Sequence, residues 1–283
     1  GGVLVLLDML FWGVVIVVPG CIAWLILRAC LCCAKSSPPW AETPWDMLLT
    51  IYNHAHRVRV VDADGQTGTM IPGIDGMRGA LLMNHRSFGD FAFDVYQGRC
   101  SNVSRWSAIA VCGLFGVLGL VCGKVIPVSR GPFPRKTTRQ ELQRMCASHE
   151  RYLIYPEGTR RASQPNADEP VALMPGGLKN IFEAGVNATC VVAVNKEKII
   201  DERRCKLSAI CWLGGGTTIY RACSPPIVSL EYSDFAGFHE AVEAAWLSTW
   251  RRAYALRERH TGPALSGAME EEALVCSSKG VQL

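Results

Sequence analysis

The chain has 283 residues, of which 49% are hydrophobic and 19% are charged. This length allows one substantial α/β domain with appendages or two small domains. A net charge of +4 is too small to indicate a nucleic-acid-binding protein but is compatible with an anionic membrane surface. The thirteen cysteines are scattered through apolar runs of a chain too long for a small disulfide scaffold, which indicates reduced thiols in a cytosolic compartment.

Residues 1–34 are the most hydrophobic segment, with Asp8 and Arg28 as their only charged side chains. About twenty apolar residues are enough to span a bilayer, so this segment predicts a membrane anchor. Because Pro19-Gly20 interrupts the segment, it is either a single transmembrane helix or a hairpin of two short helices that enters one leaflet. The alternative is a buried hydrophobic helix of a soluble domain. The basic residues near its end favour the cytosolic side for the rest of the chain.

The remaining chain divides into three parts. Residues 35–56 are predicted to form an interfacial linker and helix, with Trp40 and Trp45 as anchors at the membrane–water interface. Residues 57–260 form the folded domain. Residues 261–283 are polar, contain three consecutive glutamates and are predicted to be a disordered tail.

Short apolar runs bounded by turn residues predict the strands of the folded domain. They cover residues 57–61, 79–83, 124–130, 152–155, 191–194 and 207–213. Helices are predicted over residues 88–97, 137–148 and 234–259. The apolar residues 107–121 are too short to span a membrane comfortably and form either a core helix or an interfacial patch.

A histidine and an aspartate follow the predicted strand 79–83 in the segment Asn84-His85-Arg86-Ser87-Phe88-Gly89-Asp90. Five residues of helix rotate by about 500°, which leaves two side chains about 140° apart, so His85 and Asp90 cannot share one helical face. His85 is therefore expected to precede the helix and fold back onto Asp90 in its first turn, with Ser87 as the N-cap. An imidazole held by a carboxylate can take a proton from an alcohol near neutral pH. The alternative is an ordinary loop histidine beside a helix-start carboxylate.

A second polar segment, Tyr155-Pro156-Glu157-Gly158-Thr159-Arg160, follows the predicted strand 152–155. Arg130 likewise lies at the end of a predicted strand, the one over residues 124–130. Two arginines beside buried strands can bind a phosphate through charge-assisted hydrogen bonds. Glu157 either orients Arg160, holds a substrate hydroxyl or forms a structural salt bridge. Because the chain has no G-x-S-x-G motif, a serine acyl-enzyme is not expected.

These segments, in this order, resemble the 1-acyl-glycerol-3-phosphate acyltransferase family of glycerolipid synthesis. Residues 84–90 resemble its first motif, N-H-x-S-x-x-D, and residues 155–160 resemble its third, F-P-E-G-T-R, with Tyr155 in place of Phe. Residues 126–130 resemble its second motif, G-x-x-F-I-x-R. The likeness covers roughly residues 75–195.

The resemblance implies an α/β fold with a mixed sheet flanked by helices, set on the membrane by the N-terminal helix or hairpin. It implies that His85 is the catalytic base and that Asp90 is its partner. It also implies that Arg130 contacts the phosphate and that the acceptor is bound by four residues of the third motif, Glu157, Gly158, Thr159 and Arg160.

Chemistry and resemblance together predict an acyl-CoA-dependent O-acyltransferase that converts lysophosphatidic acid into phosphatidic acid by general-base catalysis, without an acyl-enzyme. Acyl-CoA is then a co-substrate, and neither a bound cofactor nor a metal ion is expected. Another lysophospholipid or glycerol 3-phosphate stays open as the acceptor, as does a catalytically silent lipid-binding membrane protein. The expected location is the endoplasmic reticulum or another internal membrane, with the catalytic domain facing the cytosol.

Overall fold

The structure is a computed structural model. It describes residues 43, 45–46, 49–50, 53, 57–87, 90–111, 113–128, 140, 151–159, 172–199 and 216–261. The predicted anchor, the tail after residue 261, the helix over residues 137–148 (apart from residue 140) and the strand over residues 207–213 therefore lie outside the described residues. No helix in the described part of the chain is both long enough and apolar enough to cross a membrane.

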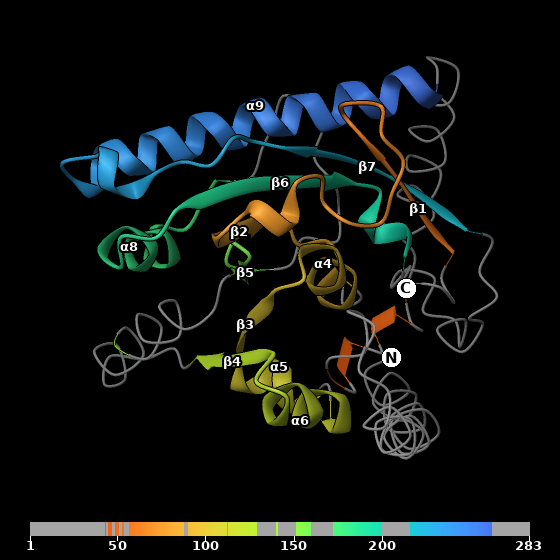
Figure 1. Ribbon diagram of the computed structural model, residues 1–283, viewed down its shortest axis with the longest axis horizontal. Helices are drawn as coiled ribbons and strands as arrows, with labels where there is room; N and C mark the ends of the chain where they lie inside the picture. Colours follow the sequence, from red (N-terminus) through yellow and green to blue (C-terminus); the bar gives the residue numbers. More distant parts are fainter. Residues whose placement is uncertain are drawn as a thin grey trace, which may run out of the picture.

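The strands of the described residues form a seven-stranded sheet through the centre of the molecule, in the order β1-β7-β6-β2-β5-β3-β4 (Figure 1). Every neighbouring pair is parallel except β6 and β7, which are antiparallel. The predicted mixed sheet is therefore confirmed. The strands are β1 (Val58–Asp62), β2 (Gly79–Met83), β3 (Ser101–Arg105), β4 (Val125–Val128), β5 (Arg151–Ile154), β6 (Ala188–Val194) and β7 (Thr217–Cys223).

The position of β2 decides where the polar segments meet. β2 lies between β5 and β6 and is parallel to both, with Leu82 opposite Ile154 on one side and Cys190 on the other. Parallel strands end at the same edge of a sheet, which is where open α/β folds place their sites. The segments that follow β2, β5 and β6 are consequently neighbours in space, although they are far apart in sequence.

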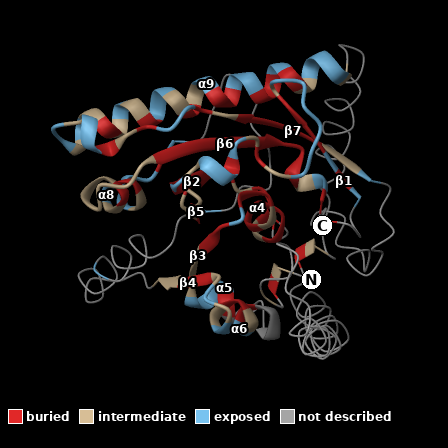
Figure 2. Ribbon diagram, in the orientation of Figure 1, coloured by how far each residue is buried: buried red, intermediate tan, exposed pale blue. Residues whose placement is uncertain are grey.

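Helices cover both faces of the sheet. α9 (Phe235–Thr261) lies along one face beside α8 (Pro175–Glu183), and α4 (Asp90–Gly98) lies on the other face (Figure 1). Figure 2 shows that the side of α9 turned to the sheet is buried and its outer side exposed. Further helices of the described residues are α5 (Trp106–Val111), α6 (Gly113–Val121) and the short 3-10 turns η2 (Ile74–Gly76), η3 (Lys196–Lys198) and η5 (Ser229–Glu231).

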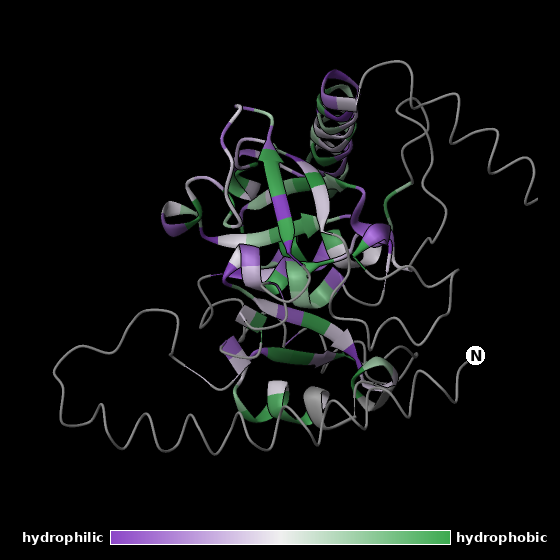
Figure 3. Ribbon diagram, turned by 90° about the vertical axis from the view of Figure 1, so that its right-hand side faces the viewer, coloured by the Kyte–Doolittle hydropathy of each residue, from purple (hydrophilic) through white to green (hydrophobic). Residues whose placement is uncertain are grey.

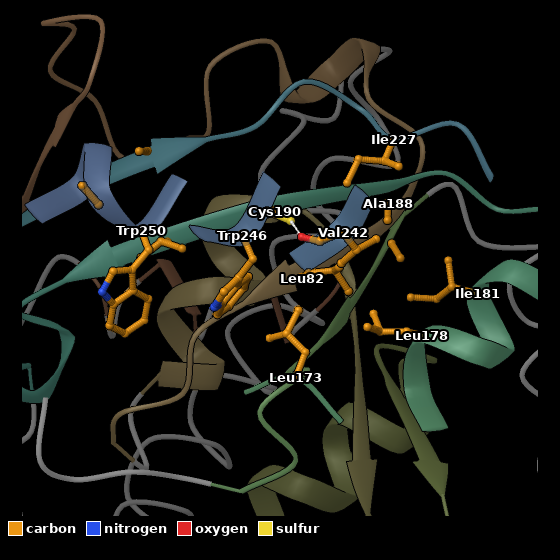
Figure 4. Packing of buried hydrophobic residues seen from close by; sticks show 14 of the residues in the cluster. Leu82, Leu173, Leu178, Ile181, Ala188, Cys190, Ile227, Val242, Trp246 and Trp250 are labelled. Atoms are coloured by element: carbon orange, nitrogen blue, oxygen red, sulfur yellow. Dashed lines mark hydrogen bonds between the residues drawn. The ribbon is translucent and has the colours of Figure 1, made fainter. Parts of the chain in front are cut away.

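Alternation along the strands divides the core into two layers. Leu82 and Cys190 face α9 and pack with Val242, Trp246 and Trp250 (Figure 4). The next residues along the same strands, which include Leu81 and Val191, face α4. Full burial of a large apolar side chain contributes about 1.5–3 kcal/mol. Hydrophobic residues accordingly follow the central strands in Figure 3.

The apolar residues 107–121 form parts of two helices, α5 and α6. Ile109 is buried in the core, whereas Val117 and Val121 are 50% and 79% exposed. The segment therefore contributes one side to the core and leaves apolar side chains on the surface.

Trp45 differs from its sequence prediction. Its indole is fully buried, packs in the α4-side core and lies 6.4 Å from the Phe91 ring, centroid to centroid. The expectation that Trp45 is an interfacial anchor is wrong, because this side chain fills space between α4 and α6. Trp40 lies outside the described residues.

Gly79 begins β2 in a conformation that other residues avoid, with φ of 104°, and a Cβ there would collide with the backbone oxygen of Asn187. We expect Gly79→Ala to lower the free energy of unfolding by about 1–3 kcal/mol, because it combines backbone strain with this collision. Urea unfolding of both proteins measures the difference. Gly176→Ala is the matched control, because its Cβ would meet open space, and an equal loss in both variants would contradict the argument.

Candidate active site

The segment after β2 is fixed to β6 by one side chain. Asn84 Nδ2 donates to the carbonyl oxygen of Ala193 at 2.9 Å, and the Ala193 N–H donates to Asn84 Oδ1 at 2.9 Å. Asn84 is fully buried, so these bonds satisfy polar groups that water cannot reach. The chain therefore leaves β2 in a defined direction just before His85.

The structure brings His85 and Asp90 together at the end of β2. His85 Nδ1 lies 3.2 Å from Asp90 Oδ2. Asp90 is the first residue of α4, and its carboxylate also accepts hydrogen bonds from the Ser87 N–H at 2.9 Å, the Ser87 hydroxyl at 2.8 Å and the Arg86 N–H. These bonds hold residues 85–87 folded back over the start of the helix.

The two partners differ in exposure. The side chain of Asp90 is fully buried, whereas that of His85 is 22% exposed. An ionised carboxylate only accepts hydrogen bonds, so His85 must donate from Nδ1. Its Nε2 then carries the lone pair, and this nitrogen is the one that can remove a proton from a substrate.

Lys196 keeps the Asp90 carboxylate charged. Burial acts to raise the pKa of Asp90, but the Lys196 ammonium, 3.8 Å from Oδ2, and the hydrogen bond with His85 outweigh it. The pKa of Asp90 consequently lies below its usual range. Asp90 is ionised at neutral pH and can stabilise an imidazolium on His85.

Asp94, one turn further along α4, shares the same cation. Its Oδ2 accepts hydrogen bonds from Lys196 Nζ at 2.6 Å and from the Tyr155 hydroxyl at 2.9 Å. Burial is the largest influence on Asp94, and together with the nearby charge of Asp90 it raises the pKa to about 6 against the opposing effect of Lys196. Two buried carboxylates therefore share one ammonium group.

This pKa has a consequence for stability. The folded protein keeps the proton of Asp94 up to about pH 6, whereas the unfolded chain loses it near pH 3.8. The stabilisation of the folded state that results from this raised pKa is complete below the pKa of Asp94 in the unfolded chain, and it is lost as the pH rises through the pKa of Asp94 in the folded protein. Relative to Asp94→Asn, wild-type stability should therefore fall by on the order of 1–3 kcal/mol between about pH 4 and pH 7. Urea unfolding of both proteins across this range measures it, and a pH-independent difference would contradict the assignment.

Glu157 lies in a buried salt bridge. Its Oε2 accepts a hydrogen bond from Arg86 Nη1 at 2.7 Å, and both side chains are fully buried. Burial raises the pKa of Glu157 even though Arg86 acts to lower it. The Arg86 guanidinium also lies 5.1 Å from the ring centroid of Trp250 on α9. Of the three sequence alternatives for Glu157, the structure shows a salt bridge, and its partner is Arg86.

The other residues of the third motif are near the surface of this edge. The Gly158 carbonyl accepts a hydrogen bond from Arg105 Nη2 at 2.9 Å, and Thr159 is exposed. Arg130 and Arg160 lie outside the described residues, so their predicted contacts with a phosphate stay predictions. In the described part of the chain, no three His, Cys, Asp or Glu side chains are grouped as metal ligands.

Sequence reasoning missed Lys196, Asp94 and Arg86. A signal existed for two of them. Asp94 is four residues after Asp90 and so shares its helical face, and Lys196 follows a buried strand just as Arg130 does. Arg86 had no comparable signal, because its buried partner lies 71 residues away.

Comparison with known proteins gives a likeness in structure only. No family model matches the sequence, and no curated protein matches it. The crystal structure of the 1-acyl-sn-glycerophosphate (LPA) acyltransferase PlsC from Thermotoga maritima is similar to this chain, with a TM-score of 0.54 over 90% of this chain and 96% of that one. The two sequences are 14% identical. The chain therefore shares the fold of this acyltransferase.

Proposed function

We propose that the protein transfers a fatty acyl group from acyl-CoA to the free hydroxyl of lysophosphatidic acid, giving phosphatidic acid. The observation that carries the proposal is the His85–Asp90 pair, 3.2 Å apart at the end of a parallel strand, in a fold shared with an LPA acyltransferase. Among the described residues, Nε2 of this partly exposed imidazole has no carboxylate partner, and we propose that it acts as the base.

The proposed reaction has two steps. His85 Nε2 takes the proton of the acceptor hydroxyl while the oxygen attacks the thioester carbonyl, and Asp90 stabilises the resulting imidazolium. The tetrahedral intermediate then collapses, the C–S bond breaks, and the leaving CoA sulfur takes the proton back from His85. The products are an ester and free CoA, and no acyl-enzyme forms.

Acceptor binding is assigned to the residues beyond β4 and β5. Arg130 and Arg160 are proposed to bind the phosphate, because guanidinium groups form bidentate hydrogen bonds with phosphate oxygens. Thr159, which is exposed beside this edge, is available to donate its hydroxyl. Glu157 acts on this segment through its bond to Arg86. An internal membrane, with this edge on the cytosolic side, is the proposed location.

The test uses the full chain, purified in detergent, with acyl-CoA and each of three acceptors: lysophosphatidic acid, lysophosphatidylcholine and glycerol 3-phosphate. Products are identified by mass spectrometry and CoA release is followed in parallel. We expect phosphatidic acid, and no CoA release without acceptor. A different acylated product would change the acceptor, whereas the absence of any acylated product would overturn the proposal in favour of a catalytically silent lipid-binding protein.

A further inference from the structure

Two buried side chains and one partly buried side chain lie behind the His85–Asp90 pair and take no part in the reaction proposed above. They are Lys196 in the turn after β6, Asp94 on α4 and Tyr155 at the end of β5. Tyr155 stands where the third motif has Phe, so its hydroxyl is a departure from that pattern. The contacts of this hydroxyl and of Lys196 explain why a tyrosine at this position differs physically from a phenylalanine.

We infer that Lys196, Asp94 and Tyr155 are positioning residues for the His85–Asp90 pair: Lys196 holds Asp90 as an ionised acceptor, and Asp94 orients the ring of Tyr155 on which His85 rests. This inference rests on the proposed function for its kinetic consequences. The structural claim, that Lys196 and Tyr155 fix the hydrogen bond between His85 and Asp90, can be tested without measuring enzyme activity.

Lys196 is placed to act on three residues at once. Its side chain is fully buried, and Nζ donates to the Asn84 carbonyl oxygen at 2.5 Å and to Asp94 Oδ2 at 2.6 Å while lying 3.8 Å from Asp90 Oδ2. A buried ammonium without compensation is costly, so this cation is held by the groups around it. Because it is buried, Lys196 cannot bind the substrate and can affect catalysis only through its neighbours.

Tyr155 supports the imidazole directly. Its ring stacks on that of His85 with centroids 4.2 Å apart and an angle of 11° between the planes. The Tyr155 hydroxyl donates to Asp94 Oδ2 at 2.9 Å. This hydrogen bond fixes the outer end of the ring and so the direction in which the side chain points. A phenylalanine could stack in the same place but would lack this bond to α4.

In the described part of the chain, charged and titratable groups of several segments lie in the cluster around Lys196. They are His85 and Arg86 after β2, Asp90 and Asp94 on α4, Tyr155 and Glu157 after β5, and Glu197 in the same turn. Removal of the Lys196 cation leaves the acidic groups in excess. Loss of a nearby positive charge makes every proton in this cluster harder to remove. His85 should therefore reach its neutral form, in which it acts as the base, only at higher pH.

The kinetic test compares Lys196→Met with Lys198→Met, which removes an exposed lysine of the same turn. We expect Lys196→Met to lower kcat by about tenfold to a hundredfold with KM little changed, and to move the acid limb of the pH–rate profile upward by about one pH unit. Lys198→Met should change neither. Unchanged kcat and an unchanged pH profile in Lys196→Met would overturn the inference.

A double variant tests whether Lys196 positions the His85–Asp90 pair or only neutralises the buried charge of Asp94. If Lys196 only compensates Asp94, then Asp94→Asn combined with Lys196→Met should recover both stability and kcat. Under the inference, the double variant recovers stability toward urea but keeps a reduced kcat and the shifted acid limb, because Asp90 still lacks its cation. Recovery of full kcat would contradict the role assigned to Lys196.

Tyr155→Phe tests the second half. It removes one hydroxyl, which donates a hydrogen bond to Asp94. We expect a fall in kcat of about two- to tenfold, and the effects of Tyr155→Phe and Asp94→Leu should be non-additive, because both remove the same hydrogen bond. Additive effects would show that the two residues act independently.

A spectroscopic test does not depend on turnover. The Nδ1–H proton of His85, assigned by its loss in His85→Ala, should give a downfield proton resonance in the full chain with labelled histidine. We expect this resonance in wild type and Lys198→Met, and its loss or upfield shift in Lys196→Met. If no acceptor is acylated, the proposed function fails while this measurement still decides the positioning claim. An unchanged resonance in Lys196→Met would refute that claim.

Discussion

His85→Ala is expected to lower kcat for acyl transfer by about a thousandfold, because general-base catalysis by a positioned imidazole contributes about 10²–10⁴ to the rate. Because His85 also bonds to the buried Asp90 carboxylate and stacks on Tyr155, its removal should in addition lower the free energy of unfolding by about 1–3 kcal/mol. Steady-state assays with acyl-CoA and lysophosphatidic acid, with urea unfolding in parallel, measure both effects.

His239→Ala is the matched control for this variant. His239 lies on α9, and its side chain is 22% exposed, the same fraction as that of His85. Its replacement removes an imidazole of equal exposure away from the sheet edge and should keep wild-type turnover. Full turnover in His85→Ala, or an equal loss in both variants, would exclude His85 as the base.

Breaking the Arg86–Glu157 salt bridge from either side is expected to lower the free energy of unfolding by about 3–5 kcal/mol, because the remaining charge is buried without a partner. Arg86→Met and Glu157→Gln are the two single variants. The pair is not fully satisfied even in the native protein, since Nε and Nη2 of Arg86 and Oε1 of Glu157 have no hydrogen-bond partner among the described residues. The double variant should therefore recover most of the lost stability.

The control for this prediction is an exposed pair with similar geometry. Arg99 Nη1 lies 2.9 Å from Asp75 Oδ1, but the two side chains are 44% and 77% exposed. Arg99→Met should cost less than about 1 kcal/mol, as is usual for surface pairs. Urea unfolding of all four variants measures the difference, and a similar loss in Arg99→Met and Arg86→Met would contradict the importance of burial.

The sequence predicted those elements whose signal is local. Strand β2 (Gly79–Met83) is an uninterrupted apolar run, and its predicted and observed bounds agree. Strand β3 (Ser101–Arg105) was missed, because its residues are mostly polar and only its pairing between β4 and β5 makes it a strand. α8 was also missed, although Pro175 at its first position is a recognisable start signal.

The same distinction holds at the site. His85 and Asp90 are five residues apart, so one motif reveals both. Lys196 and Asp94 are 102 residues apart, and Arg86 and Glu157 are 71 apart. These pairs meet only because β2 lies between β5 and β6, and no local pattern specifies that strand order. The reacting pair could therefore be predicted from the sequence, whereas the contacts that the supporting residues make could not.

The carboxamide of Asn84 extends the hydrogen-bonding of the sheet by one further step, because it pairs with Ala193 much as a peptide unit of a longer β2 would. The amide hydrogen of Ala193 is thus protected by a side chain, and its exchange with deuterated water should accelerate in Asn84→Ala while the amides of mid-strand β6 stay slow. Because Asn84 is bonded to β6, the turn that carries His85 should move only when the central strands β2 and β6 separate. Local opening of the outer loops should therefore leave the position of His85 unchanged.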